Sequence, residues 1–262
     1  MVMVCLLPRA NGADWGSLSA MKNASYLALA LFGFAACGDD GGTSGGADAS
    51  IDVVVNTTIT ISGVASEITA SGRMPQEGVQ ITVFKISDDS VIAMTTSAAD
   101  GTYSVSAQSN GAAVDGYLKA TKAGLKDTYL YPPGPLSMDF SGATTLMLKA
   151  NTQSLANQLA GASAPDPAKG WVGVLVVDGP AAGAMPVMGA TIAATPTGEI
   201  HYNGSAGVPQ AQAMSTAADG IGYAMNVPAG QIMIGATKTG TTFKAHSINA
   251  RANQITLTLV TP

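Results

Sequence analysis

The chain repeats three short patterns in the same order, and this repeat constrains its fold more than any other feature. Met-Pro-x-x-Gly begins at Met74 and Met185, Ala-Asp-Gly begins at Ala99 and Ala218, and Ala-Thr-Lys-x-Gly begins at Ala120 and Ala236. The copies are offset by 111, 119 and 116 residues, whereas solenoid repeats are about 20 to 50 residues long. The repeat therefore predicts two tandem domains.

Each copy contains short runs with the pattern of β-strands. The runs at 79–83 and 255–259 alternate apolar and polar residues, which is the period of a half-buried strand. Strands are predicted at 57–64, 79–85, 91–97, 103–107 and 117–122, and again at 171–178, 190–195, 221–227, 231–237 and 255–260. An insertion at 199–209 predicts a longer hairpin in the second copy, and Asp100-Gly101 predicts a tight hairpin turn in the first.

The segment between the copies predicts one short helix. Thr152 is expected to cap a helix over 151–161, with Leu155 and Leu159 on one face and Gly161 at its end. The predicted division is a β-sandwich domain at 56–150, a helix and linker at 151–170, and a second sandwich domain at 171–262, each folding independently.

The repeated motifs resemble the carboxypeptidase regulatory-like domain. The resemblance covers residues 61–124 and 172–262 and rests on Pro-x-x-Gly before an alternating strand, Ala-Asp-Gly before a tyrosine, and a strand ending in Lys-x-Gly. It implies an all-β fold of two tandem transthyretin-like, Ig-like β-sandwiches. In enzymes with this domain, catalysis lies in a separate zinc peptidase domain, whose His-x-x-Glu motif does not occur in this sequence. The resemblance thus implies an accessory role.

The N-terminal region predicts export and lipid anchoring. After a short basic start at 21–23, residues 24–36 are almost purely apolar, which is typical of a signal peptide and short for a membrane-spanning helix. The run ends in Phe34-Ala35-Ala36-Cys37, which resembles the lipobox of bacterial lipoproteins, in which the cysteine is lipidated. The alternative is an ordinary signal peptide cut near Ala36. Residues 1–36 are interpreted as a start extension plus signal peptide, with Met1 or Met21 as the start, and 37–55 as a lipidated, disordered tether.

The sequence contains no pattern that predicts catalysis. Its two cysteines, Cys5 and Cys37, lie in the N-terminal region, and neither of its two histidines, His201 and His246, has a metal-binding partner within reach in the sequence. We therefore expect no enzymatic activity, no metal site and no cofactor. With 12 basic residues against 17 acidic ones, the chain also lacks the positive charge that nucleic-acid binding requires.

One stretch suggests a ligand site. Tyr129 and Tyr131 precede Pro132-Pro133, and their rings can stack on a sugar or peptide; the alternative is that both pack on the sandwich edge.

The leading interpretation is a non-catalytic cell-envelope lipoprotein with binding or spacer domains, anchored by its lipid at the outer membrane or cell surface. The alternatives are a carbohydrate-binding surface protein and an accessory subunit of an envelope enzyme or secretion complex. The expected partners are the membrane, through the N-terminal lipid, and a protein or glycan.

Overall fold

The computed structural model describes residues 58–180 and 183–262. The interpretations of residues 1–57, including the signal peptide, Cys37 and the tether, lie outside the described residues.

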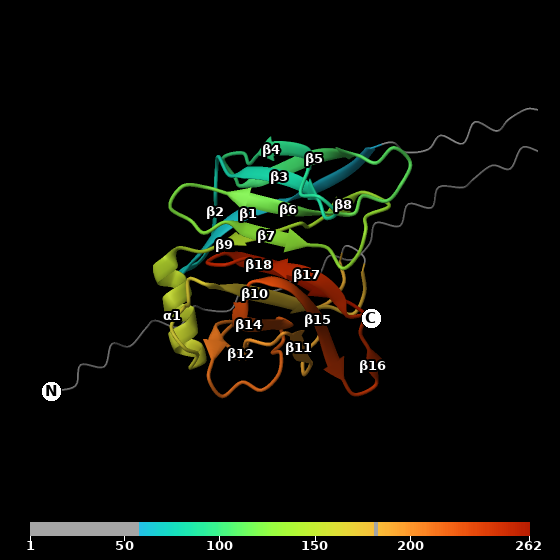
Figure 1. Ribbon diagram of the computed structural model, residues 1–262. Coiled ribbons are helices and arrows are strands. Elements are labelled where there is room, and N and C mark those ends of the chain that lie inside the picture. The colour runs from blue at the N-terminus through green and yellow to red at the C-terminus, as the bar shows by residue number, and fades with distance from the viewer. Residues whose placement is uncertain (1–57, 181–182) are drawn as a thin grey trace, which may run out of the picture. The chain divides into compact units, whose positions relative to one another are not determined.

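The chain forms two sets of strands, and one helix lies at their side (Figure 1). We call the first set module 1: β1 (Thr58–Thr69), β2 (Gly72–Pro75), β3 (Gln80–Lys85), β4 (Val91–Thr96), β5 (Thr102–Gln108), β6 (Gly116–Thr121), β7 (Thr128–Tyr131), β8 (Phe140–Ser141) and β9 (Thr145–Met147). The helix α1 (Ala150–Ala160) follows. Module 2 consists of β10 (Lys169–Val176), β11 (Thr191–Thr195), β12 (Glu199–Asn203), β13 (Pro209–Gln210), β14 (Ile221–Pro228), β15 (Gly230–Lys238), β16 (Thr241–Thr242), β17 (His246–Ala250) and β18 (Ile255–Val260). The all-β fold with one short helix, predicted from the sequence, is confirmed.

The strands form three sheets, and the largest belongs to both modules. Its nine strands run in the order β13-β12-β14-β10-β18-β7-β6-β3-β4. A five-stranded sheet centred on β1 completes the module 1 sandwich, and a four-stranded sheet centred on β15 completes that of module 2. The modules meet where β18 pairs in parallel with β7, from Ile255 opposite Thr128 to Thr258 opposite Tyr131.

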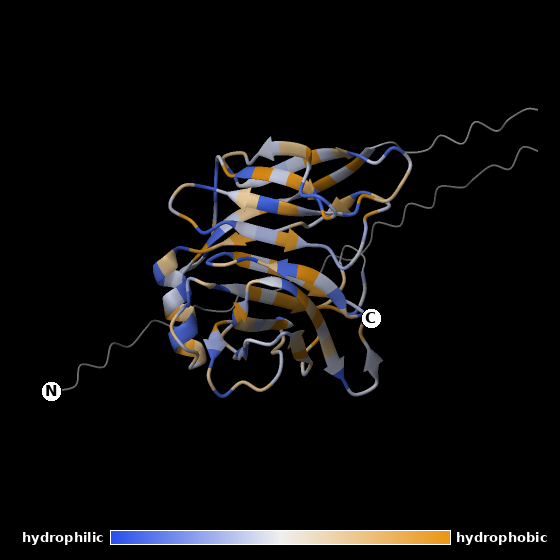
Figure 2. Ribbon diagram, in the orientation of Figure 1, coloured by the Kyte–Doolittle hydropathy of each residue, from blue (hydrophilic) through white to orange (hydrophobic). Residues whose placement is uncertain are grey.

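The two faces of the shared sheet serve different cores. Successive side chains of a strand point to opposite faces, so Leu257 of β18 and Leu130 of β7 lie on one face and Thr256 and Tyr129 on the other. The first face packs in the module 1 core, which contains Leu118 and Leu130 and contacts Leu257. The second face packs in the module 2 core, which includes tyrosines of module 1. Along the strands, apolar residues are interleaved with polar ones (Figure 2).

The shared sheet argues against the expectation that each domain folds by itself. The predicted boundaries do fall close to the ends of elements, because α1 begins at Ala150 and β10 at Lys169. Separating the modules would nevertheless expose the paired edges of β7 and β18 to water, together with the tyrosines between them. We therefore expect the two modules to unfold together.

The modules differ in the neighbour of one strand. β4 pairs with β3, whereas β12, which occupies the same place in the repeat, pairs with β14, the counterpart of β5. The Asp100-Gly101 turn consequently joins β4 to a strand of the opposite sheet, so the predicted hairpin at this turn is wrong. A hydrogen bond of 2.8 Å from the Ala65 amide to the Gly101 carbonyl holds this turn in place. The predicted longer hairpin at 199–209 is confirmed by the pairing of β12 with β13.

The helix is present where it was predicted, but the predicted cap is wrong. Lys149, not Thr152, is the N-cap residue, and its side chain makes no capping hydrogen bond. Leu155 and Leu159 are each 46% exposed, while Asn157 is buried because its side-chain oxygen accepts a hydrogen bond from the Trp171 indole at 3.1 Å. The helix thus turns a satisfied polar side chain toward the sheet.

We expect Gly101→Ala to destabilise the fold more than Gly124→Ala. Both glycines have positive φ, +77° and +81°, so alanine costs about 1 to 2 kcal/mol of backbone strain at either position. A Cβ at Gly101 would also lie 2.6 Å from the carbonyl oxygen of Ala65, while a Cβ at Gly124 meets no atom within 4 Å. Chemical denaturation of both variants would measure the difference. Equal losses of stability would contradict the close approach of Gly101 to the Ala65 carbonyl.

Candidate functional site

The most distinctive side-chain cluster is a stack of aromatic rings where the modules meet. Tyr117 of β6 stacks on Phe84 of β3 with ring centroids 5.4 Å apart, and on Tyr131 of β7 at 4.9 Å. Tyr129 lies tilted against Tyr117 at 6.0 Å. All four rings come from module 1, yet they pack with the core of module 2. We call these four residues and Arg251 the junction cluster.

Arg251, in the turn between β17 and β18, ties module 2 to these rings. Its guanidinium carbon lies 4.7 Å from the ring centroid of Tyr129 and 5.3 Å from that of Tyr117, which is cation–π distance. A guanidinium nitrogen also donates a hydrogen bond to the Tyr117 hydroxyl at 2.8 Å and lies 3.4 Å from a carboxylate oxygen of Asp89. Burial raises the pKa of the Tyr117 phenol, and the hydrogen bond that Tyr117 donates to Asp89 raises this pKa further.

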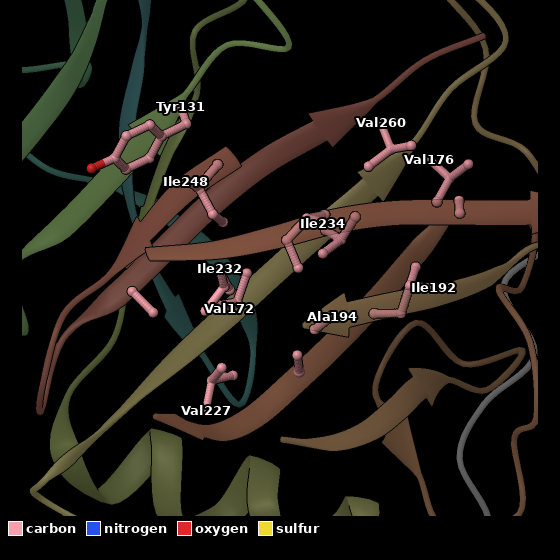
Figure 3. Close-up of a cluster of buried hydrophobic side chains, with 14 of the residues drawn as sticks. Tyr131, Val172, Val176, Ile192, Ala194, Val227, Ile232, Ile234, Ile248 and Val260 are labelled. Atoms are coloured by element: carbon pink, nitrogen blue, oxygen red, sulfur yellow. The ribbon is translucent and has the colours of Figure 1, made fainter. Parts of the chain in front are cut away.

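Tyr131 connects β7 to two strands of module 2. Its ring belongs to the module 2 core, which also contains Ile248 of β17 (Figure 3). The backbone carbonyl of Tyr131 accepts a hydrogen bond from the Thr258 hydroxyl of β18 at 3.0 Å. Burial raises the pKa of the phenol, which keeps the hydroxyl neutral.

The structure places both predicted ligand residues in the interior. Tyr129 is 7% exposed and Tyr131 is 3% exposed, so neither offers a ring face to a sugar or a peptide. The packing alternative describes their surroundings, although they pack between the modules and not on a free sandwich edge. A ligand-binding role for them stays a prediction that would require the junction cluster to open. Sequence reasoning missed the contact with Arg251, because that residue lies more than a hundred positions away from every ring of the cluster.

A second group of polar side chains supports the turn between α1 and β10. Glu199 accepts hydrogen bonds from the Asn226 amide at 3.0 Å and the Ser163 backbone at 2.8 Å, and these bonds lower the pKa of its carboxyl. Asp219 accepts a hydrogen bond from the Ile221 amide at 3.1 Å, as expected of a turn residue. These contacts hold the backbone in place. The carboxylates of Glu199 and Asp219 are thus engaged in structural hydrogen bonds and do not form a free acid–base pair.

The part of the chain that the structure describes contains no group of three His, Cys, Asp or Glu side chains placed to hold a metal ion.

An open groove of about 600 Å³ lies over β11, β15 and β16, lined mainly by threonines together with Lys238 and Phe243. Across it, the hydroxyls of Thr191 and Thr237 are 2.7 Å apart and hydrogen-bond each other. Among the described residues, no helix is both long and apolar enough to cross a membrane.

Comparisons with known proteins do not assign the chain to a family. No protein-family model matches the sequence, and no curated protein matches it. The resemblance to the carboxypeptidase regulatory-like domain therefore stays a prediction.

The solved structures that it resembles include the TIE protein of Bacillus anthracis, with 13% identity over 78% of this chain and a TM-score of 0.25; the match spans only 34% of that protein. The shaft pilin SpaA from Lactobacillus rhamnosus GG has 12% identity, coverage of 79% of this chain and 98% of the pilin, and a TM-score of 0.26. GBS52, the minor pilin of Streptococcus agalactiae, has 13% identity, coverage of 78% and 95%, and a TM-score of 0.24. At these identities and scores, the likeness defines neither a family nor a function for this chain.

His246 links stability to pH. Its Nε2 lies 2.7 Å from the Thr258 hydroxyl, and burial lowers the pKa of its imidazole. The folded state therefore favours the neutral ring, while the unfolded chain takes up a proton below about pH 6.5. We expect stability to be complete above that pH and to decrease as the pH falls below it. Denaturation midpoints between about pH 8 and 5 should fall more steeply for the wild type than for His246→Gln; parallel profiles would contradict this.

Proposed function

We propose that the chain is a non-catalytic lipoprotein of the cell envelope whose two sandwich modules act as a rigid spacer. The observation that carries the proposal is the β7–β18 pairing with the junction cluster beside it. A spacer needs a joint that does not bend, and a joint made of backbone hydrogen bonds meets that need better than a flexible linker.

The side chains at the joint support the same role. The rings of Tyr117, Tyr129 and Tyr131 are buried in the core of the other module, so bending the joint would expose aromatic surface to water. Thr256 and Thr258 of β18 are also buried, and each donates its hydroxyl hydrogen to a backbone carbonyl, of Asn249 and Tyr131 respectively. These features favour one fixed arrangement of the modules.

The remaining parts of the proposal rest on the sequence. The apolar run before Cys37 and the lipobox-like residues around it support export and lipid anchoring at the outer membrane or cell surface. The resemblance to an accessory domain of peptidases supports a non-catalytic role. The carbohydrate-binding alternative relied on exposed faces of Tyr129 and Tyr131, and it loses that support because both rings are buried. No observation favours the accessory-subunit alternative.

Spin-label distances between the modules test the rigid joint. With Cys5 and Cys37 replaced by serine, labels at the exposed positions Ser104 of β5 and Thr239 beside β16 report on one module each. We expect a single narrow distance distribution in the wild type. Tyr131→Ala removes a buried ring, a change that costs about 3 to 5 kcal/mol, and should broaden the distribution, whereas Tyr131→Phe keeps the ring and should leave it narrow. A broad wild-type distribution would refute the spacer.

Metabolic labelling tests the anchor. We expect the wild type to incorporate a clickable fatty acid and to partition into the detergent phase. Several acyl chains anchor a protein stably, at about 0.8 kcal/mol per buried methylene. The Cys37→Ser variant should be unlabelled and either unprocessed or released in soluble form, while Cys5→Ser should behave as the wild type. An unlabelled wild type found only in the aqueous phase would contradict lipidation.

A further inference from the structure

The methionines of this protein lie on its surface. Nine methionines fall within the described residues, and seven of them are between 48% and 80% exposed: Met74, Met94, Met138, Met185, Met188, Met214 and Met233. The other two, Met147 and Met225, are each 0% exposed. Methionine is ordinarily among the residue types most often buried, so this distribution is unusual.

Other large aliphatic residues of the same chain do not share this exposure. Of thirteen isoleucines in the described ranges, only Ile86 is exposed, and of eleven leucines only Leu155 and Leu159 are. The fold therefore buries most of its branched aliphatic side chains and leaves most of its methionine thioethers in water. Shortage of interior space does not explain this, since Met233 alternates on β15 with the fully buried Ile232 and Ile234.

The exposed methionines are also spread over both modules and several kinds of element. Met94 lies on β4 at one edge of the nine-stranded sheet, Met214 lies in the loop before β14, and Met74 and Met185 occupy equivalent places in the two repeats. A set scattered in this way does not form one docking patch. What its members share is a thioether sulfur open to solvent.

We propose that these seven surface methionines form an oxidant sink that consumes hypohalous acids and peroxides while the fold stays intact. With a peroxide, a lone pair of the sulfur attacks an oxygen, so that an S–O bond forms and the O–O bond breaks. With hypochlorous acid the lone pair attacks chlorine, an S–Cl bond forms and the Cl–O bond breaks with release of hydroxide, and water then replaces the chloride on sulfur. The sulfur loses two electrons and becomes a sulfoxide. Hypochlorous acid is reduced to chloride with release of a proton, and hydrogen peroxide is reduced to water. Each surface methionine thus removes one equivalent of oxidant.

The fold tolerates this chemistry because of where each sulfur lies. A sulfoxide is polar, and at an exposed position its oxygen is solvated by water, so no core contact is lost. At Met147 and Met225 the same oxygen would enter an apolar cluster without a hydrogen-bond partner, which disrupts packing. Both of these sulfurs are closed to solvent, so the reaction stops at the surface set. This inference is independent of the spacer function, because it depends on exposure alone.

Titration of the full chain with hypochlorous acid, followed by peptide mass spectrometry over residues 58–262, tests the proposal. We expect each of the seven surface methionines to oxidise at least about ten-fold faster than Met147 and Met225, since reactivity follows exposure. The thermal unfolding midpoint should stay unchanged until the surface set is consumed. Oxidation of the two buried methionines at a similar rate, or unfolding while only the surface set is oxidised, would overturn the proposal.

A variant with all seven surface methionines changed to leucine isolates the sink. Mixed with an oxidant-sensitive reporter enzyme, the wild type should protect the enzyme from limiting hypochlorous acid, and this variant should lose most of that protection. A matched variant with Met147→Leu and Met225→Leu should protect as the wild type does. All three proteins keep Cys5 and Cys37, so the thiol contribution is equal. Equal protection by all three would overturn the sink, and the rate measurement on the wild type holds even if the seven-fold variant fails to fold.

Discussion

The parallel pairing of β7 with β18 is the interaction on which the rest of the structure depends. It extends the sheet of each module into that of the other, so that one nine-stranded layer carries the module 1 core on one face and the module 2 core on the opposite face. The side-chain period of two makes this sharing possible, because each strand at the joint supplies residues to both cores. Aromatic rings and Arg251 then fill the corner where one core ends and the other sheet begins.

The edge of module 1 that corresponds to β18 cannot form a second pairing of this kind, because that edge is interrupted. β18 runs unbroken beside β10 from Ile255 to Val260, whereas β1 is flanked by two short strands, β8 and β9, with a kink between them. The kink brings the carbonyl of Ala143 so close to Gly63 that a Cβ there would lie 2.1 Å from the oxygen. In module 2, the Tyr202 hydroxyl accepts a hydrogen bond from the Ile192 amide at the edge of β11. Interrupting and capping open edges in this way limits uncontrolled strand pairing between molecules.

The division between buried and exposed side chains follows from side-chain chemistry. Branched aliphatic residues fill both cores, threonines line the groove over β15, and methionines occupy surface positions of both modules. Asn157 of α1 is buried, and its side-chain oxygen accepts a hydrogen bond from the Trp171 indole. That contact supports the burial of Asn157 on a helix whose Leu155 and Leu159 stay exposed, which reverses the usual amphipathic arrangement.

The sequence by itself determined the repeat, the all-β class, most strand positions and the place of the helix, because these depend on local periodicity and turn residues. Only the tertiary structure decided which strands pair. Backbone donors and acceptors are the same in every strand, so residues 79–83 and 255–259 show the same alternation although one belongs to an internal strand of module 1 and the other to the joint. The role of Tyr131 was likewise undecided, because the ring of a tyrosine suits a ligand platform and a core equally well. Its ring is buried against residues of module 2, such as Ile248, which sequence periodicity does not connect to it.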